Sequence, residues 1–557
     1  MYMEEVPAIA TGVAWLAPPD WRAAVERFLP QGATTVEKVS AIEAGLRSPL
    51  GQSLRDAMAR WIVDEIVPVE RLVPQPYLEW RSPVRDSMMF VVAHLSPARL
   101  APKILEQIEL PPNTSVEERL LRLIAKVPGL QKLGQVIARN QHLHPALRKA
   151  LAKLENGIRD VKPEDMRAII HKELGEKVDK FSVEVSTDIL KEASVSAVIR
   201  FTWRNLGTGR RQRGVFKVLK PHIPQYFKED MEYLQGLAEY FGDRHDAYGF
   251  PAHLLPDTFQ KVRRLLRHEV NFRREQKTLV EAGALYRSYR HIRVPEVIQE
   301  LCTPAITALT EERGIKVTSA VARLPANTRR KVAEQLLEAL IAVPLLSSVQ
   351  EAVFHGDPHA GNLLYDSRTG KLVILDWALR ERLGREPRRH LALMFLLVSL
   401  RDPVGVCNEI LALSRPVIRI TSRQGRIIRK SVYEFLESLP ASQLPSAADA
   451  MRLLEHVAVQ GTKFPGPLIM LSKVMFTLEG ILGDMLGADT DIGFTIARHV
   501  ALHWLSHRSE FRSPLRKRDW VTLQCSALLF PSRWGIRWQQ TMLNRWLTDK
   551  PASAAAT

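Results

Sequence analysis

Apolar residues recur every three to four positions through the first 110 residues of this chain. The clearest run is Leu54, Met58, Trp61, Ile62 and Ile66. This spacing puts apolar side chains on one face of a helix, so it predicts a mostly helical N-terminal region. We assign residues 1–110 to that region and find no candidate chemistry in it.

A break at residues 111–113 precedes two shorter predicted helices. Ser115 followed by Glu118 predicts a capping box, and the helix that it opens extends to about Lys126. The Pro-Gly pair at 128–129 interrupts the pattern, and a second helix is predicted from about residue 130 to 140. We treat residues 111–181 as a helical extension in front of the next domain.

From about residue 182 the pattern changes to short runs rich in β-branched and aromatic residues. Residues 198–206 and 214–219 predict two strands, joined by a Gly-containing hairpin over 207–210. One long helix is predicted over about 257–285. Two further strands are predicted at 294–301 and 305–310.

Beyond residue 324 helices dominate, except around residues 353–378. Strands, a long helix, more strands and then a helical half is the order of an α+β fold of the bilobal protein-kinase-like type, here with a helical N-terminal extension. We therefore expect an N-lobe over 182–310, a C-lobe over 311–500 and a separate tail over 501–557.

The segment 353–378 carries the most informative polar residues of the chain, Asp357, Asn362 and Asp376, between apolar runs. Phosphoryl transfer from ATP uses one carboxylate to orient the attacking hydroxyl, and an amide and a second carboxylate to hold metal ions on the phosphates. We expect Asp357 to be catalytic and the other two residues to ligate Mg²⁺. Because Gly and Pro interrupt the sequence from 356 to 361, the first two residues should lie on a loop.

Two histidines in that loop, His355 and His359, have the H-x-x-x-H spacing of a helical zinc site. Pro358 and Gly361 make a helix improbable there, so we expect both histidines to be structural hydrogen-bonding groups and not metal ligands.

Lys217 lies in an apolar strand pattern, G-V-F-K-V-L-K-P. In kinases a lysine on this strand contacts the α- and β-phosphates and pairs with a helix glutamate. Glu269 and Glu275 are both candidates for that glutamate. Six residues apart on one helix, they project roughly 120° apart, so they cannot do the same job, and the choice stays open.

The chain has 78 Lys and Arg against 61 Asp and Glu, which gives a net charge of +17. This balance favours anionic partners such as nucleotide phosphates or an acidic membrane surface. We find no nucleic-acid-binding module and expect no nucleic-acid partner. The three cysteines are far apart, which is typical of a reducing compartment.

We find no signal peptide and no uninterrupted run of 18 apolar residues, and we expect a cytoplasmic protein without a transmembrane helix. The two most apolar stretches, 391–400 and 467–486, are expected to be core helices.

The C-terminal tail combines basic and aromatic residues, with Arg512, Arg516, Lys517 and Arg518 ahead of an apolar run and Trp534, Trp538 and Trp546 after it. That composition is typical of an interfacial membrane segment, so peripheral association with the inner face of the membrane is one expectation. The alternative is a helix packed against the C-lobe.

A helix motif upstream, Lys132-Leu133-Gly134-Gln135, together with H-G-D-x-x-x-x-N and the later Asp, resembles the UbiB/AarF family of atypical protein-kinase-like proteins. The resemblance covers about residues 115–400. It implies that ATP and Mg²⁺ are bound in the cleft between lobes. It also implies slow ATPase or kinase turnover, and a link to membrane-associated quinone or isoprenoid lipid metabolism.

The same resemblance implies roles for several residues. Lys132 and Gln135 would reach into the active site and occlude a protein-substrate groove. A nucleotide loop would include Ala193, Ser194 and Val195, and the backbone near Glu311 and Glu312 would bind the adenine edge.

The sequence departs from that family in three places. The nucleotide loop is only partly alanine, the family's E-x-D motif ends in Asn271, and D-F-G has Trp377 as its second residue. Two alternatives therefore stay open. Trp377 favours an aminoglycoside-phosphotransferase-like small-molecule kinase, whereas the altered nucleotide loop and Asn271 favour a non-catalytic, ATP-gated scaffold.

Overall fold

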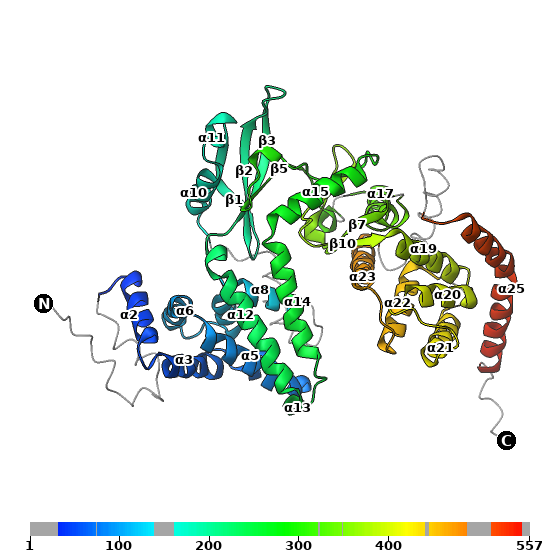
Figure 1. The fold of residues 1–557 in the computed structure, drawn as a ribbon, viewed down its shortest axis with the longest axis horizontal. Coiled ribbons are helices and arrows are strands. Elements are labelled where there is room, and N and C mark those ends of the chain that lie inside the picture. The colour runs from blue at the N-terminus through cyan, green and yellow to red at the C-terminus, as the bar shows by residue number, and fades with distance from the viewer. Residues whose placement is uncertain are drawn as a thin grey trace, which may run out of the picture. The chain divides into compact units, whose positions relative to one another are not determined.

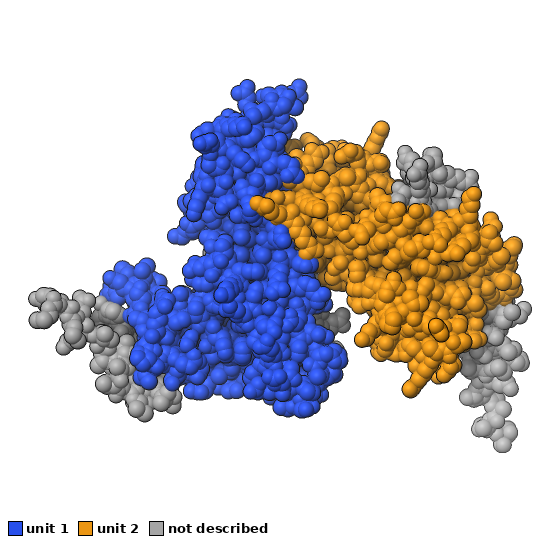
Figure 2. All heavy atoms as spheres, viewed as in Figure 1, with its two compact units in different colours: residues 1–272, 298–309 blue, residues 273–297, 310–557 orange. Residues whose placement is uncertain are grey.

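The computed structural model describes residues 32–73, 75–138, 161–320, 324–347, 349–440, 445–486 and 514–548, with the backbone alone at 76, 135–138, 320, 534 and 536–548. The chain forms two compact units (Figures 1 and 2). Unit 1 comprises Met1–Phe272 and Ile298–Leu309, and unit 2 comprises Arg273–Val297 and Thr310–Thr557.

Unit 1 begins with helices, as the apolar spacing predicts for the described part of residues 1–110. These are α2 (Thr35–Arg47), α3 (Gly51–Arg60), a π-helix (Trp61–Ile66), α4 (Val69–Leu72), a 3₁₀ segment (Gln75–Trp80), α5 (Arg81–His94), α6 (Pro97–Glu109), α7 (Val116–Ile124) and α8 (Pro128–Ala138). Ser115 caps α7 by accepting a hydrogen bond from the Glu118 N–H, which is one half of the expected capping box.

These N-terminal helices share one hydrophobic core with the long helices that follow the sheet. Ile62 and Leu100 are buried together with Leu234 and Leu237 of α12 (His222–Asp243) and Leu266 of α14 (Leu254–Glu269). The N-terminal helices are therefore an integral part of unit 1.

The sheet of unit 1 has the strand order β1-β2-β3-β5. The strands are β1 (Glu184–Glu192), β2 (Ser196–Arg204), β3 (Arg211–Leu219) and β5 (Ile306–Thr310), and α10 (Pro163–Leu174), followed by the short α11 (Lys177–Lys180), precedes them. β2 and β3 pair antiparallel as the predicted hairpin. Met166 and Ile170 of α10 pack with Phe216 and Val218 of β3 in a second core.

The strand predicted at 294–301 is wrong as a continuous element, although residues 296–298 do pair with β5 through bonds from the Ile298 N–H to the Ala308 carbonyl and from the Thr310 N–H to the Glu296 carbonyl. The structure has a two-residue strand, β4 (Ile292–Arg293), and a 3₁₀ turn (Gln299–Leu301) instead. Pro295 lies between them and has no N–H to donate to a sheet, which explains why the apolar run does not form a regular strand.

The single long helix predicted over 257–285 is also wrong, because two helices occupy this stretch. α14 ends at Glu269, and α15 (Phe272–Tyr286) begins three residues later. Asn271 directly precedes α15, a position where Asn is favoured because its side chain can accept from exposed N–H groups. Glu269 and Glu275 therefore lie on different helices.

Unit 2 holds two small sheets and most of the C-terminal helices. β7 (Glu351–His355) pairs antiparallel with β10 (Arg380–Gly384), and a second sheet has the order β4-β9-β8-β6. Its other strands are β6 (Ile315–Lys316), β8 (Leu363–Asp366) and β9 (Lys371–Ile374). The helices include α16 (Val317–Ala320), α17 (Ala326–Leu337), α18 (Val343–Leu346), α19 (Arg385–Ser399), α20 (Pro403–Leu413), α21 (Arg423–Ser438), α22 (Ala447–Val459) and α23 (Gly466–Leu486).

The two most apolar predicted segments are core helices, as expected. α19 buries Leu391 and Leu397, and α23 buries Leu478 and Leu482. Within the described residues, no helix is both long enough and apolar enough to cross a membrane.

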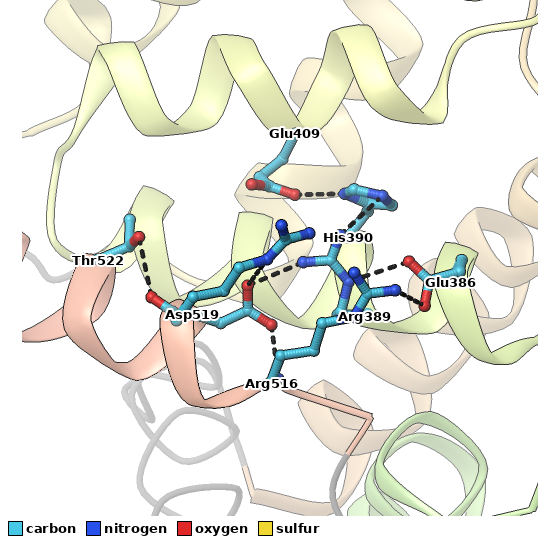
Figure 3. Close-up of polar contacts among 8 residues, drawn as sticks. Glu386, Arg389, His390, Glu409, Arg516, Asp519 and Thr522 are labelled. Carbon is cyan, nitrogen blue, oxygen red and sulfur yellow. Dashed lines mark hydrogen bonds and ion pairs between the residues drawn. The ribbon is translucent and has the colours of Figure 1, made fainter.

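The tail helix α25 (Lys517–Thr548) packs against α19 through a polar cluster (Figure 3). Asp519 is buried and forms an ion pair with Arg389 at 2.8 Å, while Arg516 pairs with Glu386 at 2.6 Å. Further along, Ser526 donates to Asp402 of the α20 cap. The packed-helix alternative therefore holds for the first turns of α25, and the side chains of Trp534, Trp538 and Trp546 lie outside the described residues.

We expect Asp519→Ala to destabilise unit 2, because it removes the buried carboxylate partner of Arg389 and leaves only the half-exposed Glu386 at 3.2 Å. Loss of one partner of a buried ion pair costs roughly 3 kcal/mol or more. Denaturant unfolding should show this loss, whereas Arg518→Ala, which removes an exposed cation beside the same carboxylate, should change stability little. Equal effects of the two substitutions would contradict the proposed importance of the buried pair.

Candidate functional site

Asp357 and Asn362 lie on the loop that follows β7, as predicted, and His355 holds this loop in place. The His355 ring is buried, accepts the Asp357 N–H on Nδ1 at 3.2 Å and has Nε2 2.9 Å from the Leu375 carbonyl. Burial lowers the pKa of His355, so the ring is neutral near pH 7. His359 accepts the Gly361 N–H, so both histidines make structural hydrogen bonds as expected.

Asp376 is brought beside this loop by the β8–β9 hairpin. Leu363 pairs with Ile374, and the Leu375 N–H donates to the Asn362 carbonyl at 2.8 Å. The Asn362 side chain, which is buried, donates to the Asp357 carbonyl at 3.4 Å. The three residues predicted to handle phosphate and metal thus meet at one end of this hairpin.

The backbone at Asp376 is left-handed, with φ of 54°, which turns the chain sharply after β9. The next residue, Trp377, is fully buried, and its indole N–H donates to the Ile374 carbonyl. Its ring packs edge-on against the His355 ring, with the two ring centres 5.0 Å apart. Trp377 therefore has a packing role that accounts for its presence without a substrate contact.

A residue that the sequence analysis missed is Lys473 on α23. Its Nζ lies 3.1 Å from Asp357 Oδ1. No residue from 358 to 361 carries a fixed positive charge, so α23 supplies the cation beside this carboxylate. The only sequence indication was a lysine inside an otherwise apolar helix pattern, and nothing in that pattern connects it with a loop 116 residues earlier.

Lys217 lies on β3 opposite to the buried Phe216 and Val218, as the strand alternation predicts. Its Nζ lies 5.6 Å from the centre of the Phe272 ring, at the first residue of α15. Glu275, three residues later in α15, is buried and shares a helix face with Phe272.

Glu269, one of the two candidate partners of Lys217, pairs with Lys132 instead. At the end of α14 it pairs with Lys132 of α8 and also accepts the Ser194 hydroxyl at 3.2 Å. Ser194 belongs to the turn 193–195 between β1 and β2, which is closed by the bond from Ala193 N–H to the Ser196 carbonyl. The predicted nucleotide loop and the Lys-Leu-Gly-Gln helix thus meet at one carboxylate, while the Gln135 side chain lies outside the described residues.

The predicted hinge residues Glu311 and Glu312 directly follow β5. Glu312 pairs with Arg293 at 3.1 Å and accepts the Thr310 hydroxyl, and burial raises the pKa of its carboxyl group. Their proposed backbone contact with adenine stays a prediction.

The side chains of Asn362 and Asp376 offer oxygen ligands of the kind that Mg²⁺ prefers, and they do not form a complete protein metal site. Among the described residues, no three His, Cys, Asp or Glu side chains gather into a metal-binding group. Mg²⁺ prefers oxygen ligands and commonly takes one or two protein groups together with substrate phosphates. The Asn362 amide oxygen and the Asp376 carboxylate fit that requirement.

Comparison with known proteins identifies the domain. Residues 153–409 match the ABC1 atypical kinase-like domain, which confirms the protein-kinase-like fold expected from the order of the elements. An uncharacterized protein of Synechocystis is 25% identical over 401 residues, covering 71% of this chain and 65% of that protein.

Two further relatives have descriptive names. The chloroplastic protein ACTIVITY OF BC1 COMPLEX KINASE 7 of Arabidopsis thaliana is 25% identical over 363 residues, or 64% of this chain. A probable protein kinase UbiB of Xylella fastidiosa is 26% identical over 432 residues, or 75% of each chain. This chain spans half the length of the Arabidopsis relative.

Proposed function

Since the chain contains an ABC1 atypical kinase-like domain and has UbiB relatives, we propose that it binds Mg·ATP and transfers or hydrolyses the terminal phosphoryl group. The observation that carries this proposal is the convergence of Asp357, Asn362 and Asp376 at the end of the β8–β9 hairpin. Positioning and neutralisation of charge supply most of the rate in this chemistry, so a small set of fixed polar groups is sufficient.

Each residue has one role in the proposal. Asp357 orients the acceptor hydroxyl or water and takes its proton. Asn362 and Asp376 would hold Mg²⁺, which when bound neutralises the phosphate charge. Lys217 contacts the α- and β-phosphates, and Glu275 is its proposed partner because Glu269 is engaged by Lys132. The turn 193–195 covers the nucleotide, with Lys132 and Glu269 fixing Ser194.

Lys473 adds a cation beside the proposed base. Its ammonium group lies 3.1 Å from Asp357 Oδ1 and neutralises the carboxylate. Since both side chains are partly exposed, at 37% and 22%, the lysine can move to a phosphate oxygen when nucleotide is bound. There it would stabilise the negative charge that develops on the transferred group.

The two alternatives differ from this proposal in testable ways. A small-molecule kinase is favoured by the Asp-Trp pair at 376–377, and the burial of Trp377 means that this residue would act there through packing and not through a substrate contact. A non-catalytic scaffold would bind Mg·ATP without releasing phosphate, so binding and turnover must be measured side by side.

Asp376→Asn should lower Mg²⁺-dependent phosphate release by at least about 100-fold, because the carboxylate that holds the metal is lost. The matched control is Asp366→Asn, which alters an exposed turn at the other end of β8. Unchanged release in Asp376→Asn would remove the assignment. Nucleotide binding without release in the wild-type protein would favour the scaffold.

Lys473→Ala should lower kcat by about 10- to 100-fold with little change in KM, since the cation acts on charge that appears in the transition state. Lys473→Arg should keep part of the rate. Lys430, an exposed lysine of α21, provides the control substitution to Ala. A rate that rises in Lys473→Ala would contradict this role and indicate that the lysine restrains Asp357.

We also propose that α25 brings the protein to an acidic membrane surface where a quinone or other isoprenoid lipid is handled. Leu528 and Leu529 are exposed, as is Val521 about two turns earlier, whereas Asp519, Leu523 and Ser526 are buried on the side that packs. Lys517 and Arg518 at the start of the helix suit anionic headgroups.

Leu528→Glu/Leu529→Glu should therefore reduce co-sedimentation with vesicles containing anionic lipid, because it adds negative charge to the exposed apolar residues. Val459→Glu, at an exposed apolar position on α22, serves as the control. Equal sedimentation of the two variants would exclude α25 as the membrane-binding element.

A further inference from the structure

The helix that carries Lys132 is held at its first turn by a carboxylate from another helix. The Gly129 N–H, near the start of α8, donates to Asp230 Oδ2 of α12 at 2.9 Å. The first N–H groups of a helix have no partner within the helix, and negative charge at this end is stabilising. Asp230 is fully buried and therefore fixes the start of α8 three residues before Lys132.

Asp230 is fixed in turn by Arg99 of α6. The guanidinium Nη1 lies 2.6 Å from Asp230 Oδ1, and both side chains are almost completely removed from solvent. Arg99 also donates to the Lys126 carbonyl, in the turn that leads into α8. One buried ion pair thus ties α6, α12 and the start of α8 together.

A close backbone approach restricts α8 further. A Cβ at position 129 would lie 1.9 Å from the hydroxyl oxygen of the buried Tyr233 of α12, so either the tyrosine or the start of α8 would have to shift. α8 also packs along α14, the helix that ends at Glu269. Any displacement of the start of α8 therefore changes how Lys132 meets Glu269.

We propose that Asp230, held by Arg99, is a positioning residue for Lys132, and that the N-terminal helices act on the nucleotide loop through this contact. The connection runs from Arg99 through Asp230 and Gly129 to Lys132, and from Lys132 through Glu269 to Ser194. All of these residues belong to unit 1. The inference deepens the proposed nucleotide site and rests on it. It gives the helical region before residue 128 a function that its sequence does not indicate.

A double-mutant cycle tests the proposal in the full-length protein. Arg99→Met/Asp230→Leu removes both charges together, so that no unpaired buried charge remains to unfold the protein. Lys132→Ala and Arg99→Met/Asp230→Leu should each raise the Kd for Mg·ATP about fivefold or more. The combined variant should bind no more weakly than Lys132→Ala, because the pair acts only through the lysine.

Glu229→Gln is the matched control for damage to the contact between α6 and α12. Glu229 adjoins Asp230, accepts hydrogen bonds from the Ser96 N–H and hydroxyl at 2.8 and 2.9 Å, and lies 3.5 Å from the Arg99 guanidinium, a longer ion pair than the 2.6 Å pair of Arg99 with Asp230. Among the described side chains of α8, none pairs with Glu229. The Glu229→Gln variant should have a lower midpoint of thermal unfolding and an unchanged Kd for Mg·ATP. A Kd change as large as that of the double substitution would overturn the proposal, as would additive effects in the Lys132→Ala background.

Gly129→Ala gives an independent route if the double substitution fails to fold. It keeps both charges and should displace α8 through the contact with Tyr233, raising the Kd in the wild-type background alone. An unchanged Kd there would also overturn the proposal.

Amide hydrogen exchange over residues 129–134, without nucleotide, separates this inference from the proposed function. Exchange should accelerate in Arg99→Met/Asp230→Leu and not in Glu229→Gln. A wild-type protein that binds no nucleotide would refute the proposed function, while unchanged exchange in the double substitution would refute the positioning role.

Discussion

A carboxylate that folding removes from water needs a cationic or hydrogen-bonding partner, and this requirement links elements far apart in the chain within both units. Asp230 takes Arg99 from a helix 131 residues earlier, and Asp519 takes Arg389 from a helix 130 residues earlier. Glu192 at the end of β1 takes Lys220 just after β3. In each case the pair joins elements that the chain itself does not place side by side.

The ion pairs at the candidate site are of another kind, since their side chains keep some contact with solvent. Lys132 and Glu269 are 15% and 22% exposed, and the pair of Lys473 and Asp357 is more open still. Such pairs lose less on separation than fully buried ones, so their members can exchange a partner for a phosphate or a metal ion. The fully buried pairs hold the scaffold, and the partly exposed pairs belong to the residues proposed to handle the nucleotide.

Much of the site could be predicted because its residues are close in sequence. Asp357, Asn362 and Asp376 lie within twenty residues on a loop and a hairpin, and local turn chemistry is enough to bring them together. The choice between Glu269 and Glu275 could not be predicted, because it depends on a helix break at residues 270–271 that the apolar periodicity does not reveal. The continuous strand expected at 294–301 was predicted from its apolar residues, and the effect of Pro295, which has no N–H to donate to a sheet, was not taken into account.

By itself the sequence determined the protein-kinase-like order of elements, the loop that carries the acidic motif and the side of β3 that Lys217 occupies. These features follow from short-range periodicity and from Gly and Pro, which act on neighbouring residues. Only the tertiary structure decided which cation meets Asp357, which glutamate meets Lys132 and which carboxylate holds the start of α8. Each of these pairs spans about 100 or more residues, and a buried or partly buried charge selects its partner by position in the folded core, which no local pattern encodes.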